Sequence, residues 1–266
     1  MKKTLLSLAM TATLGLFGTA AVAAPINLGG VVFDPDSIFD FTTTDSMFET
    51  IVTSVGNVLN GYGVINSLNG TNVATFCPGC ELTYKFTGYT VTSVGTPAGS
   101  QFTFSGGVIQ VFVDNTPDFN SLSANSAGDG ALWLTLDGRN HLDLLTGNTG
   151  TLHSTGTPVA VGIAGNGRGY LDVRTGAGLG LAQANFDTNT IAMVNPGGAP
   201  SFADFQFTSS FQRLPGLATF VSDDGRTYGL FGSNDFQGNA IPEPGSLALL
   251  GLGLVGLVAA RRRKSV

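Results

Sequence analysis

The stretch ELTYKFT, residues 81–87, alternates apolar and polar side chains with a period of two. Neighbouring side chains of an extended strand point to opposite faces, so Leu82, Tyr84 and Phe86 fall together on one face. A strand with one apolar and one polar face is typical of an antiparallel sheet that covers a core on one side. The stretch therefore predicts a half-buried antiparallel strand.

The same alternation recurs in four further runs: residues 101–105, 132–136, 171–174 and 205–212. Residues 108–113 are apolar on both faces apart from Gln110, which makes them a candidate central strand. Turn dipeptides such as Asn69-Gly70 and Asp137-Gly138 separate the runs. Short strands joined by frequent turns predict an all-β fold, and we expect an antiparallel β-sandwich or jelly-roll-like ectodomain.

Residues 47–59 fit two patterns. Their apolar side chains follow helical spacing, and Ser46 with Glu49 would form a capping box at a helix start. Ile, Val and Thr dominate residues 50–55, however, and Gly56 interrupts the segment. We favour a strand over a helix here.

The N-terminus carries an export signal. Two lysines precede an apolar stretch, residues 5–19, and Ala21-Val22-Ala23 follows as a small-residue cleavage site. This order is typical of a secretory signal peptide, which we expect to comprise residues 1–23. The body, residues 24–240, is then one secreted β-rich domain. If it is divided, residues 195–200 are the best internal boundary.

The C-terminal segment, residues 241–266, has three parts in a fixed order. Pro242-Glu243-Pro244 precedes an apolar run, residues 245–260, and Arg261-Arg262-Arg263-Lys264 follows it. As a transmembrane helix the run would rise about 24 Å, short of the roughly 30 Å of a bilayer core. We therefore expect a brief membrane insertion, with a permanent anchor as the alternative. The four basic residues should stay on the cytoplasmic side, which leaves the body outside.

This tail closely resembles the PEP-CTERM sorting signal of Gram-negative bacteria. The resemblance implies that an exosortase, a polytopic membrane peptidase, cleaves near Pro242, Glu243 and Pro244 at the inner membrane. It also implies export through that membrane to the cell surface or the extracellular space. The genes of this family commonly accompany exopolysaccharide synthesis and serve biofilm or floc surfaces, so an exopolysaccharide matrix is the implied partner.

The body also resembles, more loosely, uncharacterised ectodomains of other PEP-CTERM proteins. Flocculation-associated members are among them, and the resemblance implies no activity. Four segments carry it: residues 61–66, 80–84, 171–173 and 186–189.

The charge of the body excludes some partners. Removing both end segments leaves six basic against seventeen acidic residues, a net charge of −11. Phosphate contacts need clustered Lys and Arg, so we expect no binding to nucleic acid. Thirty-eight glycines raise the question of disorder, but nineteen phenylalanines supply enough apolar surface for a folded core.

The two cysteines lie close together in the sequence Cys77-Pro78-Gly79-Cys80. In an exported protein such a pair is expected to form a local disulfide. A redox centre is the alternative, but it needs a helix N-terminus after the pair to lower the pKa of a thiol, and residues 81–87 have a strand pattern. We favour a structural disulfide that stabilises a turn by about 2 kcal/mol at most.

The search for catalytic groups is mostly negative. His141 and His153 lack a nucleophile elbow or a metal-ligand spacing, and we expect them to be surface or turn residues. Asp114, Asp118 and Asp129 surround one loop and offer oxygens of the type that bind Ca²⁺, but solvated loop acids are the favoured interpretation. We expect no enzyme, no metal and no cofactor.

The sequence thus predicts a structural or adhesive protein of an exopolysaccharide matrix. The first alternative is a carbohydrate-binding module, in which Trp133 lies on the polar face of its strand and contacts sugar; core packing is the other interpretation of this residue. The second alternative is a polysaccharide-modifying enzyme, whose paired carboxylates would meet only in space.

Overall fold

The computed structural model describes residues 24–241 except 36–38, 40, 97–99, 157–163 and 214–218. Pro25–Pro242 form one compact unit. The predicted signal peptide, the Pro242-Glu243-Pro244 motif, the apolar run and the basic end lie outside the described residues. Within the described part, the helices lack the length and apolarity needed to cross a lipid bilayer.

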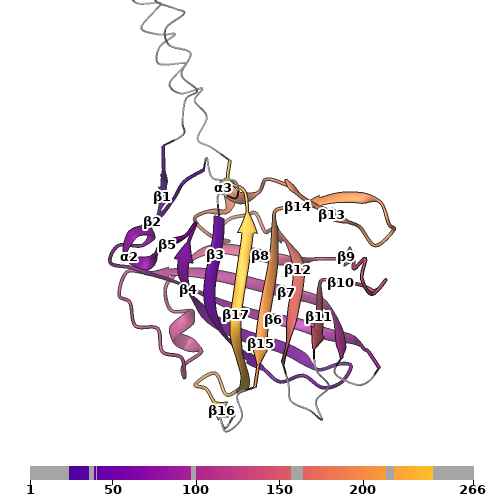
Figure 1. Cartoon of the computed structure of the whole chain (residues 1–266). Coiled ribbons are helices and arrows are strands. Elements are labelled where there is room, and N and C mark those ends of the chain that lie inside the picture. Colours follow the sequence, from indigo (N-terminus) through magenta and orange to yellow (C-terminus); the bar gives the residue numbers. More distant parts are fainter. Residues whose placement is uncertain are drawn as a thin grey trace, which may run out of the picture. The chain divides into compact units, whose positions relative to one another are not determined.

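Strands dominate this unit, as Figure 1 shows. The first are Ile26–Leu28 (β1), Val31–Phe33 (β2), Phe41–Thr50 (β3), Val58–Leu68 (β4), Thr71–Asn72 (β5), Glu81–Val94 (β6), Gln101–Asp114 (β7) and Ala131–Arg139 (β8). Then come His141–Leu142 (β9), Thr149–Gly150 (β10), Leu152–Gly156 (β11), Ala164–Val173 (β12), Ile191–Val194 (β13), Pro200–Ala203 (β14), Phe205–Gln212 (β15), Phe220–Val221 (β16) and Thr227–Gly238 (β17). The short helices are Val73–Phe76 (α2), Gln183–Phe186 (α3) and the 3₁₀ turn Asn125–Ala127 (η1). The all-β prediction is confirmed.

One antiparallel sheet of eleven strands closes on itself. Its strands follow the order β12, β15, β17, β3, β4, β6, β7 and β8. The last of these returns to the first, because Leu136 of β8 pairs with Val173 of β12. At the other end of β12, β11 lies between β12 and β7 and pairs with both. Each of these eight long strands therefore has a neighbour on either side, which leaves no long edge among them.

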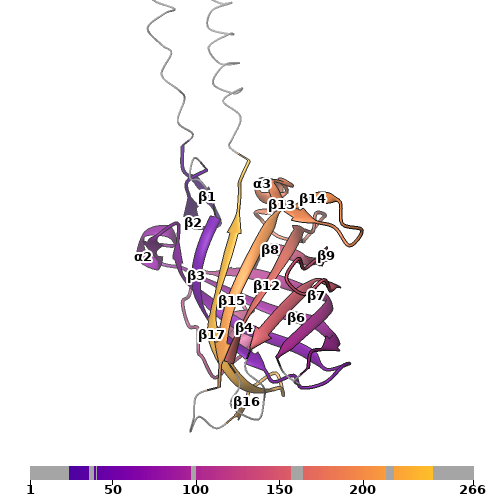
Figure 2. The same cartoon turned by 45° about the vertical axis from the view of Figure 1, so that its right-hand side comes forward.

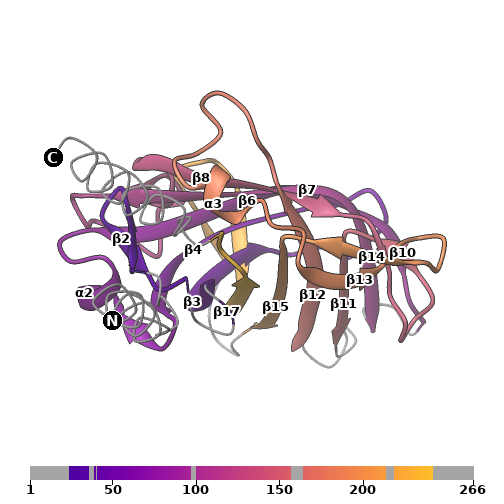
Figure 3. The ribbon, with the colours of Figure 1, turned by 90° about the horizontal axis from the view of Figure 1, so that it is seen from above.

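The closed sheet is flattened into two layers. Figures 1 and 2 show β3, β17, β15 and β12 side by side in one layer, with β6, β7 and β8 crossing behind them. Figure 3 shows the two layers from above. Shifts of register interrupt the pairing of five strand pairs. Such irregularities increase the local twist and help a sheet to bend. They lie at Thr44/Asp45, Leu59/Gly61, Val91/Ser93, Val111/Phe112 and Tyr228/Leu230.

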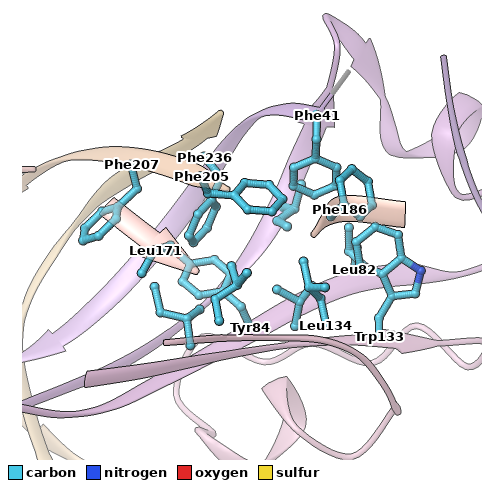
Figure 4. Close-up of a cluster of buried hydrophobic side chains, with 14 of the residues drawn as sticks. Phe41, Leu82, Tyr84, Trp133, Leu134, Leu171, Phe186, Phe205, Phe207 and Phe236 are labelled. Atoms are coloured by element: carbon cyan, nitrogen blue, oxygen red, sulfur yellow. The ribbon is translucent and has the colours of Figure 1, made fainter. Parts of the chain in front are cut away.

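The core lies between the layers. In Figure 4, Phe205, Phe207 and Phe236 from one layer meet Tyr84 and Leu134 from the other. Leu82, Tyr84 and Phe86 are buried as the alternation of residues 81–87 predicts. Thr83 on the opposite face is buried too, so β6 is covered more fully than a half-buried strand.

The segment 47–59 is two strand ends and a turn rather than one strand. Strand β3 ends at Thr50 and β4 begins at Val58. Between them, the side-chain oxygen of Asn57 accepts hydrogen bonds from the backbone N–H groups of Thr53 and Ser54. This Asn-centred turn explains the interruption.

Residues 195–200 likewise form a turn. It joins β13 and β14, and the side-chain oxygen of Asn195 accepts hydrogen bonds from the N–H groups of Gly197 and Ala199. The predicted internal boundary is therefore a hairpin turn within the unit.

Candidate functional site

Three adjoining hollows lie along strand β12, with volumes of about 710, 330 and 390 Å³. The first and second hollows share Thr155, Asn166 and Ser210. The second and third hollows share Asp143, Leu145 and Arg168. Since each hollow has walls in common with the next, they form one continuous surface depression, which we call the β12 trough.

The period of β12 explains why polar side chains line the trough. Residues 164–170 read AGNGRGY, so glycine alternates with larger residues. Asn166, Arg168 and Tyr170 point outward, whereas the intervening glycines face the core. A Cβ atom on Gly169 would lie 2.5 Å from the ring of Phe207, so a side chain there would displace the core. The predictions from the sequence did not include this polar face, although a glycine at every second position with polar or aromatic residues between is a signal of it.

Strands β15 and β17 extend the polar face sideways. Their antiparallel register aligns outward side chains into three rows across the sheet. These rows are Asn166–Ser210–Ser233, Arg168–Thr208–Asp235 and Tyr170–Gln206–Gln237. Hydrogen bonds join the second and third members in two rows, Ser210 to Ser233 at 3.0 Å and Gln206 to Gln237 at 2.5 Å.

The loop between β9 and β10 forms one wall of the trough, and Asp143 holds it in place. Its carboxylate pairs with the guanidinium of Arg168 and accepts hydrogen bonds from the N–H of Leu145 (3.0 Å) and the hydroxyl of Thr146 (2.9 Å). Burial acts to raise the pKa of Asp143, but these hydrogen bonds and the Arg168 charge outweigh it and hold the pKa below its usual value. Asp143 is therefore ionised and fully engaged at neutral pH.

The two histidines lie beneath this wall, and the expectation of surface or turn positions is wrong. His141 is 2% and His153 3% exposed. Their rings meet edge to face with centroids 4.8 Å apart, and His141 meets Tyr170 in the same way at 4.7 Å. The sequence does not indicate this burial, because the residues that cover the histidines come from other segments. Arg168 and Tyr170 of β12 and the loop between β9 and β10 lie over His141 and His153 only in the folded chain.

Both imidazoles are neutral at pH 7. Burial lowers the pKa of His153 to about 4, with the neighbouring His141 contributing, and burial also lowers the pKa of His141. The Nδ1 atom of His141 lies 3.2 Å from the carbonyl oxygen of Arg139, to which it can donate. The Nε2 atom of His153 is buried without a hydrogen-bond partner among the described residues.

Two carboxyl groups lie inside the closed sheet, away from the β12 trough. Asp45 and Glu49 lie on the inward face of β3 and are both buried. Burial raises the pKa of Asp45 well above its usual value and that of Glu49 to about 8, so Glu49 is mostly protonated at pH 7. Glu49 lines a cavity of only about 40 Å³ together with Phe104 and Leu152, among other residues, which leaves no room for a polymeric substrate.

A third acidic group lies at the loop after β7. Carboxylate oxygens of Glu81, Asp114 and Asp118 lie within 4.8 Å of one another. The sequence places Asp114, Asp118 and Asp129 around one loop; the structure groups the first two with Glu81 instead. The oxygens of Glu81 accept hydrogen bonds from the N–H groups of Asp118 (3.3 Å) and Phe119 (3.1 Å). These bonds give Glu81 a role in anchoring the loop.

Trp133 packs in the core, as the second interpretation of this residue predicts, and does not lie on the polar face of its strand, as a carbohydrate platform would require. It is fully buried, and its Nε1–H donates to the carbonyl oxygen of Leu28 at 2.9 Å. Leu132 pairs with Phe112 and Leu134 with Val111, so Trp133 is the extra residue of a bulge. The bulge breaks the alternation and directs Trp133 into the core.

Cys77 and Cys80 are joined by a disulfide. It follows helix α2 directly and closes the turn that leads into strand β6 at Glu81. Both cysteines are buried within the main core cluster. The disulfide therefore lies at the start of β6, the strand that contains the alternating residues 81–87.

Comparison with known proteins gives one match, at the C-terminus. Residues 240–264 match the family model described as the PEP-CTERM protein-sorting motif. No curated protein and no solved structure matches the chain. The motif indicates an exosortase-sorted surface or secreted protein, and it implies export across the inner membrane of a Gram-negative bacterium to the cell surface or the extracellular space.

Proposed function

We propose that the exported body has a structural or adhesive role in an exopolysaccharide matrix, as in a biofilm or a floc. The sorting motif at residues 240–264 is the observation that carries this proposal, because it implies export of the body to the cell surface or the extracellular space, where a matrix protein would act. The acidic body and the polar β12 trough are compatible with contact to a hydrated polymer.

A polysaccharide-modifying enzyme is the second candidate, because Asp143 and Asp235 both line the middle hollow. A glycosidase needs one protonated carboxyl group as acid and one ionised carboxylate as base or nucleophile. Asp143 is ionised, which makes it a poor acid, and its oxygens are already engaged by Arg168, Leu145 and Thr146, which makes it a poor base or nucleophile. We therefore propose a role without catalysis; turnover of a polysaccharide that disappears in Asp235→Asn would favour the enzyme.

Replacing Pro242, Glu243 and Pro244 together by alanine is expected to block sorting. The variant should keep the tail and accumulate in the membrane fraction, whereas the parent reaches the matrix. Ser265→Ala with Val266→Ala is the matched control, since both residues lie outside the matched motif. Fractionation with immunoblotting measures both.

If the alanine variant reaches the matrix at the level of the parent, the sorting argument fails. If it is retained in the membrane but the cells still aggregate normally, sorting stands and the matrix role fails. Normal placement of the control variant ensures that a loss reflects the motif rather than any change near the C-terminus.

A further inference from the structure

We propose that the β12 trough is a binding site for an extended, neutral polysaccharide chain. This proposal rests on the proposed matrix function and gives that function a place in the fold. Small-molecule sites are usually enclosed pockets that bury most of the ligand. The trough is instead a series of three connected hollows along one strand, which suits a chain that enters at one end and leaves at the other.

The chemistry of the lining fits a polyhydroxylated ligand. The middle hollow is lined by hydroxyl, amide and carboxylate groups, including Thr208, Ser233, Asn166 and Asp235. Hydroxyls and amides both donate and accept hydrogen bonds, as sugar hydroxyls do. In the third hollow, Tyr170 adds an aromatic ring that can contact the apolar face of a sugar.

The charge of the site disfavours an anionic polymer. Arg168 lines both the second and the third hollow, and Asp143 balances the positive charge of its guanidinium group. Asp235 adds a negative charge to the middle hollow, and the body as a whole is acidic. An anionic chain would meet like charge without a free cationic partner in this lining.

The topology argues against an extended peptide as the occupant. Peptides that bind to sheets commonly add a strand to a free edge. Strand β12 already pairs with β15 on one side and with β11 and β8 on the other. Recognition in the trough must therefore use side chains rather than the backbone.

An unpaired buried group at the wall of the trough gives a second, independent indication of a ligand. His153 lines the middle hollow and is only 3% exposed, and its Nε2 atom has no hydrogen-bond partner among the described residues. A buried polar atom without a partner is costly. His153 therefore leaves a hydrogen-bonding capacity at the wall of the middle hollow that the described residues do not use.

The test is a double variant of the trough, Asn166→Ala with Thr208→Ala. Both side chains are exposed, so their loss should not disturb the core. The matched control is Gln110→Ala with Thr87→Ala, an amide and a threonine exposed on β7 and β6. The probes are cellohexaose, xylohexaose, mannohexaose and chitohexaose, with hexagalacturonate as the anionic counterpart, titrated calorimetrically into the protein in the form that cells release.

We expect at least one neutral hexasaccharide to bind more tightly than hexagalacturonate. The trough variant should weaken that binding about tenfold or more, since two hydrogen-bonding groups are lost, and the control should leave it unchanged. Equal thermal unfolding of the variants and the parent shows that the loss is local.

Three outcomes would overturn the proposal: no binding of any neutral probe at millimolar concentration, tighter binding of the anionic probe, or equal weakening by both double variants. None of these results bears on whether the alanine variant of Pro242, Glu243 and Pro244 reaches the matrix. Failure of the trough and failure of the matrix role are therefore distinguishable.

Discussion

Glu49→Gln is expected to stabilise the fold by about 3 kcal/mol at pH 7. The pKa of Glu49 is 4.5 in the unfolded chain and about 8 in the fold, so folding at pH 7 requires the carboxylate to take up a proton. The glutamine variant would fold without this cost, because its amide is neutral and has a similar shape. Because the folded pKa is raised, the cost is absent below pH 4.5 and grows as the pH rises towards 8.

Chemical unfolding of parent and variant at pH 4 and pH 7 measures this effect. The difference between the two proteins should be near zero at pH 4 and about 3 kcal/mol at pH 7. The parent and the variant must be compared at the same pH. The pKa values of His141 and His153 are lowered in the fold, so both proteins become less stable as the pH falls below 6.5. Asp187→Asn, the same change of charge on an exposed side chain, is the control and should show no such gain. A gain that does not depend on pH would contradict a protonated Glu49 in the core.

Trp133→Ala is expected to destabilise the fold by about 3–5 kcal/mol. The ring packs against Phe33, Phe41 and Phe186, with centroids 6.3, 5.6 and 5.6 Å away, and alanine would leave a cavity among them. A domain of this kind has only about 5–15 kcal/mol of stability, so this substitution would remove a large fraction of it. Circular dichroism of thermal unfolding is the measurement, since the variant lacks the only tryptophan of the chain.

Two further variants separate packing from a direct role in binding. Trp133→Phe keeps an aromatic ring but loses the hydrogen bond to Leu28, and it should cost about 1–2 kcal/mol. Phe202→Ala removes a ring that is 53% exposed and should change stability by about 0.5 kcal/mol or less. If Trp133→Ala unfolds like the parent and loses only glycan binding, Trp133 is the sugar platform and its buried position is refuted.

Local patterns of the sequence predict much of the fold. Residues 81–87 indicate the inward face of β6, and residues 108–113 indicate β7, which has neighbours on both sides. These predictions succeed because the alternation of residues 81–87 and the apolar run of residues 108–113 are each properties of a single strand. The closure of the sheet depends on pairing between Leu136 and Val173, far apart in the sequence, and no local pattern reports it.

The sequence leaves the position of Trp133 open, on the polar face or in the core, for a related reason. Alternation assumes a regular strand, and the bulge between Leu132 and Leu134 shifts the pattern by one residue. No glycine marks this bulge in the sequence.

The sorting motif and the β12 trough differ in the same respect. Pro242, Glu243 and Pro244 lie next to the apolar run and the basic end, so one contiguous segment carries the signal. The trough combines β12, β15 and β17 with the loop of Asp143, segments that only folding brings together. Its one local signal is the alternation of glycine in residues 164–170, from which no prediction was made.

The intact mass of the natural protein, measured separately on the released material and on the inner-membrane fraction, tests the central claim most directly. We predict that the released chain begins at Ala24 and ends near Pro242, Glu243 or Pro244, without the apolar run and the basic end. A full-length C-terminus in the released protein, or a chain that stays uncut in the inner membrane, would contradict the account.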